Sequence, residues 1–310
     1  MKLFIGFFIF CIILFLYLHI QFQLKTSDDL EVYEMDDVSK DKLEEICDLR
    51  QPAIFSFDNE SIIKSTSKDA LMSNYHAFEV KVRNVKEKDC TVLPLKIHDS
   101  IKLFEQDKES QYFSENNGDF LQETGVIKAL QYNDEYLRPY MVSNCNYDIM
   151  MGTEGVETPF RYELNYRNYF TVTQGSVKIK LTPHKNTKYL DPINDYENFE
   201  FRSAANPWIV DPMCKYKCLE VNLNVGQTIY IPAYWWYSMK FDKNASLACF
   251  RYRTYMNNVA IVPNIIMYAL QTQNVKRQLV KQADQETESK LENKETDNSD
   301  PIGPDNQANM

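Results

Sequence analysis

Two aromatic-rich segments that alternate apolar and polar residues constrain the fold most. The first, residues 158–181, reads TPFRYELNYRNYFTVTQGSVKIKL and contains a bend at Gly175. The second, residues 219–237, reads LEVNLNVGQTIYIPAYWWY and contains a turn at Gly226. Alternation of this kind is typical of strands with one buried face, and glycines often separate neighbouring strands. Together the two segments predict a small β-barrel, a fold that can hold a site at its mouth.

The first 24 residues predict a transmembrane anchor. Residues 3–20 carry no charged side chain, and eighteen apolar residues are about the length that a helix needs to cross a bilayer. No small-residue cleavage site follows, which favours an uncleaved single-pass anchor over a signal peptide. Lys2 and Lys25 flank the segment, so the difference in positive charge between its two sides is small. That difference favours a cytosolic N-terminus without deciding the orientation.

The rest of the chain divides into a linker, one domain and a tail. We expect a polar linker over residues 25–37, a folded domain over 38–283 and a disordered acidic tail over 284–310, because the tail lacks the apolar surface needed to offset its chain entropy. The net charge of −10 argues against a nucleic-acid-binding surface. Periodicity predicts further elements in the domain: a helix from Ser39, a strand at Ala53–Phe57, a helix at Ser61–Tyr75, a strand at His76–Val85, a strand at Leu247–Met256 and a helix at Val259–Leu270 packed on the barrel.

Three motifs, in this order, resemble the cupin-like branch of the JmjC family over about residues 38–256. They are the Gly-x-x-Thr-Pro segment at Gly155, the Asn-Tyr-Phe segment at Asn168 and the Gly-x-x-x-x-Ile-Pro-x-x-Trp-Trp segment at Gly226. The resemblance implies a mainly β, double-stranded β-helix fold with flanking helices. Many members of that family are iron- and 2-oxoglutarate-dependent protein hydroxylases or demethylases.

The family's iron ligands are a His-x-Asp pair on one strand and a distant histidine, and residues two apart on a strand face the same way. The resemblance places Arg161, Glu163 and Tyr237 at these positions. A guanidinium offers no lone pair to a metal, so the triad is degraded and we expect neither metal nor cofactor. We expect Arg161 and Glu163 to neutralise each other near the Tyr237 hydroxyl; the alternative, in which Arg161 holds an anionic ligand, stays open.

The 2-oxoglutarate anchor is also displaced. Family members commonly carry a lysine two residues after the glycine that matches Gly175, where this chain has Val177. Lys178 is one residue out of phase, so it either points away from the barrel or is turned back by a bulge. Tyr169 and Trp236 are further candidate ligand contacts, although tryptophans at a strand end also serve in core packing.

The cysteines allow one local disulfide. Cys11 lies in the anchor, and six cysteines remain in the domain. In an oxidising compartment, Cys214 and Cys218 are the favoured local pair. A zinc site is not expected, because no second Cys or His pair stands at a suitable spacing.

The resulting hypothesis is a membrane-anchored, non-catalytic binding or structural module with a protein partner at the membrane. The abundance of Phe, Tyr, Ile, Asn and Lys beside only 8 glycines is typical of AT-rich coding, as in a protist or a large DNA virus. Two alternatives stay open. One is a divergent Fe(II)- and 2-oxoglutarate-dependent hydroxylase that recruits other ligands, and the other is a metal-free barrel that binds an anionic small molecule.

Overall fold

The computed structural model describes residues 2–36, 38–87, 92–209 and 215–274. The described residues fall into two compact units, one within residues 2–195 and 200–262 and one within residues 196–199 and 263–274. In the second unit, residues 263–274 are helical and the Tyr268 ring meets the Phe199 ring edge-on. The first unit contains the elements discussed below.

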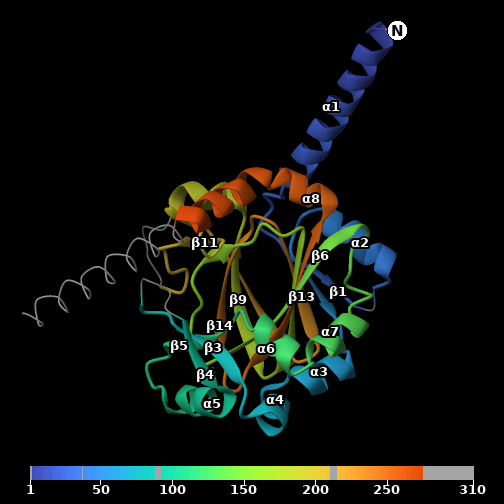
Figure 1. Cartoon of the computed structure of the whole chain (residues 1–310). Coiled ribbons are helices and arrows are strands. Elements are labelled where there is room, and N and C mark those ends of the chain that lie inside the picture. The colour runs from blue at the N-terminus through green and yellow to red at the C-terminus, as the bar shows by residue number, and fades with distance from the viewer. Residues whose placement is uncertain (1, 37, 88–91, 210–214, 275–310) are drawn as a thin grey trace, which may run out of the picture. The chain divides into compact units, whose positions relative to one another are not determined.

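Two β-sheets form the barrel (Figure 1). The larger sheet runs in the order β1-β2-β13-β8-β15-β6-β5-β3-β4 and the smaller in the order β10-β11-β7-β14-β9-β12. The predicted mainly β, double-stranded β-helix fold with flanking helices is confirmed. The strands are β1 (Tyr33–Met35), β2 (Ala53–Ser56), β3 (Glu79–Asn84), β4 (Val92–Lys96), β5 (Tyr112–Ser114), β6 (Val142–Gly152), β7 (Arg161–Tyr162), β8 (Arg167–Gln174), β9 (Ser176–Thr182), β10 (Pro192–Asp195), β11 (Glu200–Ser203), β12 (Leu219–Asn224), β13 (Gln227–Pro232), β14 (Trp236–Phe241) and β15 (Ser246–Thr254).

An apolar core fills the space between the two sheets. Phe170 and Val172 of β8 face Ile179 of β9 and Met239 of β14 in one buried cluster. Each such side chain contributes about 1.5–3 kcal/mol on burial. The alternation that predicted these strands therefore selects the side chains that join the sheets.

Helices cover the outer face of the larger sheet. A second buried cluster joins Tyr169 of β8 and Tyr252 of β15 to Leu43, Ile62 and Ile101, which lie on three of these helices. Because β8 is buried on both faces, seven of its eight residues are buried. The helices of this unit are α1 (Lys2–Leu24), α2 (Lys40–Asp48), α3 (Glu60–Thr66), α4 (Lys68–Tyr75), α5 (Ile97–Gln106), α6 (Gly118–Glu123), α7 (Ile127–Asn133) and α8 (Tyr255–Ala260), with a 3₁₀ turn η1 at His184–Tyr189.

The helix predicted at Ser61–Tyr75 is divided in two. Ser67 takes an extended conformation (φ −65°, ψ 145°) and ends α3, and its side chain accepts a hydrogen bond from the Ala70 N–H at the start of α4. The competition of a Ser side chain with the helical backbone explains the break. The predicted helix start at Ser39 agrees with the structure, since Ser39 caps α2.

The segments at both ends differ in part from the sequence predictions. The expected linker over residues 25–37 contains β1, which pairs in parallel with β2. The helix expected at Val259–Leu270 begins earlier, as α8, and after a break at Ile261 residues 262–274 are helical. The tail over 284–310, predicted to be disordered, lies outside the described residues. Helix α1 is long and apolar enough to cross a membrane, with a mean hydropathy of 2.7, although a signal sequence has the same properties.

Candidate functional site

The three residues at the expected iron-ligand positions lie together inside the barrel. β7 pairs with the start of β14 so that Arg161 lies opposite Tyr237. The Tyr237 hydroxyl donates to Glu163 Oε1 at 3.1 Å, and the Arg161 guanidinium lies 5.5 Å from the centre of the Tyr237 ring. Tyr162, between the two predicted site residues, points outward and stacks on Phe201. Arg161 and Glu163, two positions apart, therefore face the same side, as expected of a strand.

Arg161 pairs with Glu115 instead of Glu163. Its Nη2 lies 2.6 Å from Glu115 Oε2, and both side chains are almost fully buried, at 7% and 1% exposed. A second guanidinium, that of Arg83, lies 2.9 Å from Glu115 Oε1. The expected mutual neutralisation of Arg161 and Glu163 is thus replaced by a carboxylate that bridges two arginines.

Glu163 has other partners. Arg251 of β15 places Nε 3.4 Å from Glu163 Oε1, and the Asn165 amide donates to Oε2 at 3.2 Å. The other side of the Arg251 guanidinium lies 3.5 Å from Asp148. Asp148 in turn accepts the backbone N–H of Asn117 at 2.7 Å. Every charge in this part of the barrel has an oppositely charged neighbour.

Three of these ion pairs connect the two sheets. Arg83 of β3 binds Glu200 of β11 through two hydrogen bonds of 2.6 and 3.1 Å. In each pair the arginine lies on a strand of one sheet, and the carboxylate lies on, or directly after, a strand of the other: β3, β5 and β15 belong to the larger sheet, β7 and β11 to the smaller, and Glu115 and Glu163 follow β5 and β7. We call them the cross-sheet ion pairs: Arg83–Glu200, Arg161–Glu115 and Arg251–Glu163.

The surroundings fix the ionisation of these groups. Burial alone would raise the pKa of Glu115, but the Arg161 guanidinium and then that of Arg83 outweigh it and lower the pKa to about 2. Burial also raises the pKa of Tyr237, so its phenol stays neutral and can donate to Glu163. Glu115 is therefore held as a carboxylate and Tyr237 as a neutral phenol, whereas burial raises the pKa of Asp148.

The residues do not fit an iron centre. A guanidinium occupies the first ligand position, and it has no lone pair available to a metal. The carboxylate of Glu163 is held by Arg251 and Tyr237. Among residues 2–36, 38–87, 92–209 and 215–274, no group of three His, Cys, Asp or Glu side chains could hold a metal ion.

The sequence model of the cupin-like domain family matches residues 28–257. The chain belongs to the cupin-like domain family. The match begins ten residues before the domain start expected at residue 38, which agrees with the position of β1, and it ends before residue 283. No curated protein matches the chain.

Three predicted ligand contacts of this cupin-like domain face away from the interior of the barrel. Lys178 is exposed on β9, whereas its neighbours Val177 and Ile179 belong to the core, so no bulge turns it inward. The Tyr169 hydroxyl lies 3.4 Å from Cys47 Sγ in the layer between sheet and helices. Trp236 lies on the outer face of β14, where its indole N–H donates to a threonine of η1. None of these three side chains faces the interior of the barrel, where Arg161 lies.

The predicted disulfide partner Cys214 lies outside the described residues, so the pairing of Cys214 with Cys218 stays a prediction.

Sequence reasoning missed the charged residues that complete the site, above all Glu115 and Arg251. Arg251 had a signal: in LACFRYRT, alternation places it on the same strand face as Cys249, within a strand that is otherwise largely apolar. Glu115 follows the short strand β5, and no alternating or helical pattern in the sequence identifies it as a buried residue.

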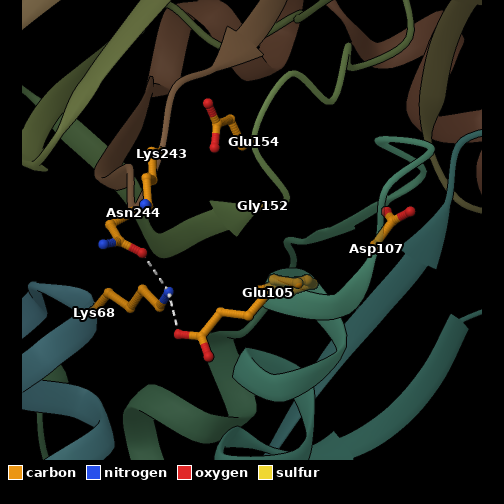
Figure 2. Close-up of a pocket in the computed structure, with 8 residues that line it drawn as sticks. Lys68, Glu105, Asp107, Gly152, Glu154, Lys243 and Asn244 are labelled. Atoms are coloured by element: carbon orange, nitrogen blue, oxygen red, sulfur yellow. Dashed lines mark hydrogen bonds and ion pairs between the residues drawn. The ribbon is translucent and has the colours of Figure 1, made fainter.

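A separate polar cavity of about 450 Å³ is lined by residues that include Lys68, Glu105, Asp107 and Asn244 (Figure 2). Lys68 Nζ bridges Asn244 Oδ1 at 2.8 Å and Glu105 at 3.5 Å. Asp107 accepts the backbone N–H groups of Glu109 and Gln111. Two of the charged groups that line this cavity, Lys68 and Asp107, thus already have partners within the domain.

Proposed function

We propose that this cupin-like protein is a membrane-anchored, non-catalytic binding or structural module. The observation that carries the proposal is the Arg161–Glu115 pair, which puts a buried, neutralised cation at the first iron-ligand position. A barrel that used iron would need a lone-pair donor there. The cross-sheet ion pairs instead join the two sheets where the family's metal would be bound.

The pairing of Arg161 also argues against an anionic ligand. A guanidinium that is to hold a carboxylate or phosphate needs free donors that point into an accessible space. Arg161 is 7% exposed and directs its Nη2 to Glu115. An incoming anion would have to displace a buried carboxylate, at a cost of several kcal/mol.

Metal analysis of the full-length protein, purified in detergent and incubated anaerobically with Fe(II) and 2-oxoglutarate, tests the non-catalytic part. We expect far less than one iron per chain. The positive control is the variant with Arg161→His, Glu163→Asp and Tyr237→His, which restores the His-x-Asp…His set, combined with Glu115→Gln so that no carboxylate loses its partner. Stoichiometric iron in the unaltered protein, lost on Glu163→Ala, would overturn the proposal.

The exposed apolar surface of α1 supports the proposed anchoring in a membrane. Its apolar side chains from Leu3 to Leu18 are exposed, which is unfavourable in water and favourable in lipid. Alkaline extraction of membranes from expressing cells should leave the protein in the pellet, with its N-terminus intact by mass spectrometry. Protection of the domain from added protease in sealed vesicles would support the cytosolic N-terminus; release of a chain that lacks α1 would show a cleaved signal instead.

A further inference from the structure

The apolar part of α1 is just long enough to cross a bilayer, so none of it extends beyond the bilayer. Its apolar part, Leu3–Leu24, has 22 residues, which at 1.5 Å per residue gives about 33 Å. The hydrocarbon core of a bilayer is about 30 Å thick, and a helix tilted by about 20° would project about 31 Å along the normal. The whole apolar helix is therefore needed to cross, and Phe22 and Leu24 lie at one surface of the bilayer.

The same end of α1 touches the folded domain. The Arg50 guanidinium lies 5.1 Å from the centre of the Phe22 ring, and Gln23 is only 6% exposed. Three residues past the helix, the Ser27 N–H donates to the Arg50 carbonyl at 3.1 Å. α1 also packs against α8, which lies beside its base (Figure 1). No flexible linker separates the membrane span from the domain.

The domain surface around this junction carries exposed apolar and aromatic side chains. Tyr255 and Val259 of α8 are 62% and 40% exposed, and Leu49, next to Arg50, is 52% exposed. On η1, Lys188 lies over the ring of Tyr189, and Lys185 of the same turn donates to the Asp28 carbonyl close to α1. Tyrosine, lysine and single aliphatic side chains together suit the headgroup region of a bilayer.

We propose that the domain sits directly on the bilayer through this junction face, defined as Leu49, Tyr189, Tyr255 and Val259. The inference rests on the proposed anchoring by α1. Since Phe22 lies both at the lipid surface and against Arg50, the residues beside Arg50 and α8 are at headgroup depth. The domain has a fixed orientation, so a partner approaches from the surfaces away from α1, near α4 and α5 (Figure 1).

Depth-dependent quenching tests this orientation in the full-length chain. Tyr255→Trp places a probe on the junction face, and Tyr132→Trp on α7 is the matched control, because Tyr132 is 80% exposed and α7 lies away from α1 (Figure 1). Both variants are reconstituted in phosphatidylcholine vesicles with and without lipids brominated near the headgroup. The signal of the three native tryptophans is measured in the unaltered protein and subtracted.

We expect at least a twofold greater loss of added fluorescence for Tyr255→Trp than for Tyr132→Trp, and the same for Val259→Trp. Flotation of the vesicles is measured first. A chain that does not float with the vesicles overturns the anchoring and this inference with it. A chain that floats, but in which the junction and control probes are quenched equally, overturns the seating of the domain and leaves the anchoring intact.

Discussion

Replacement of Arg161 by methionine is the most direct perturbation of the site. It removes the closer of the two guanidiniums that hold the Glu115 carboxylate and leaves that buried carboxylate with Arg83 alone. Removal of one partner from a buried ion pair typically costs about 3–5 kcal/mol. Arg161 lowers the pKa of Glu115 more than Arg83 does, so its loss removes the larger of the two charge interactions that stabilise the carboxylate.

The assay is a double-mutant cycle by urea denaturation of the full-length protein in detergent, with Arg161→Met, Glu115→Gln and both together. We expect the single Arg161→Met to lose about 3 kcal/mol and the double variant to recover part of it, with a coupling energy of about 2–3 kcal/mol. The matched control is Lys42→Met, since Lys42 and Glu45 form a largely exposed ion pair of 2.8 Å, worth less than about 1 kcal/mol. If Arg161→Met costs no more than Lys42→Met, the buried pair does not stabilise the barrel and the reasoning fails.

The structure leads to three further predictions. Because the folded-state pKa of Glu115 is lowered, its contribution to stability is complete above pH 4.5 and is lost as the pH falls toward 2. Between pH 6 and 3, the urea midpoint should therefore fall more steeply for the unaltered protein than for Glu115→Gln. Parallel pH profiles of the two proteins would contradict this. Gly175→Ala should cost more stability than Gly226→Ala, by at least about 1 kcal/mol. Both glycines have positive φ, but only at Gly175 would an added Cβ lie 2.9 Å from a backbone atom, the Cα of Ala245. Equal melting temperatures of the two variants would refute this explanation. Lys178→Ala should change the free energy of unfolding by less than about 0.5 kcal/mol, and a larger loss would mean that its side chain is not solvated as the structure shows.

The barrel could be predicted because it depends on a local pattern. In β9 and β14, side chains alternate between core and outside, and a period of two in the sequence encodes that directly. The same rule gave the correct face for Lys178 as its first alternative. The resemblance also placed Arg161 and Tyr237 near each other, whereas their direct pairing across β7 and β14 comes from the structure.

The contacts of the site could not be predicted in the same way. On β8 both faces are buried, so alternation separates Tyr169 from Phe170 without saying which of them faces the barrel interior. Arg161 and Glu163 share one strand face, but a side chain on another strand approaches more closely than the residue two positions along. Glu115, the partner that the structure selects, follows a three-residue strand that joins the sheet only through β3 and β6.

The three cross-sheet ion pairs explain how the barrel tolerates a cation at a ligand position. In the iron-binding members of the family, a His-x-Asp pair and a distant histidine meet at one ion. Here each of the three guanidiniums is matched by a carboxylate on, or directly after, a strand of the opposite sheet, so these ion pairs join the same region. A buried charge that loses its partner is costly, so Arg161, Glu115 and Arg83 depend on one another. Restoring a histidine at position 161 alone would therefore leave Glu115 short of one partner, and a return to metal binding requires the whole set to change together.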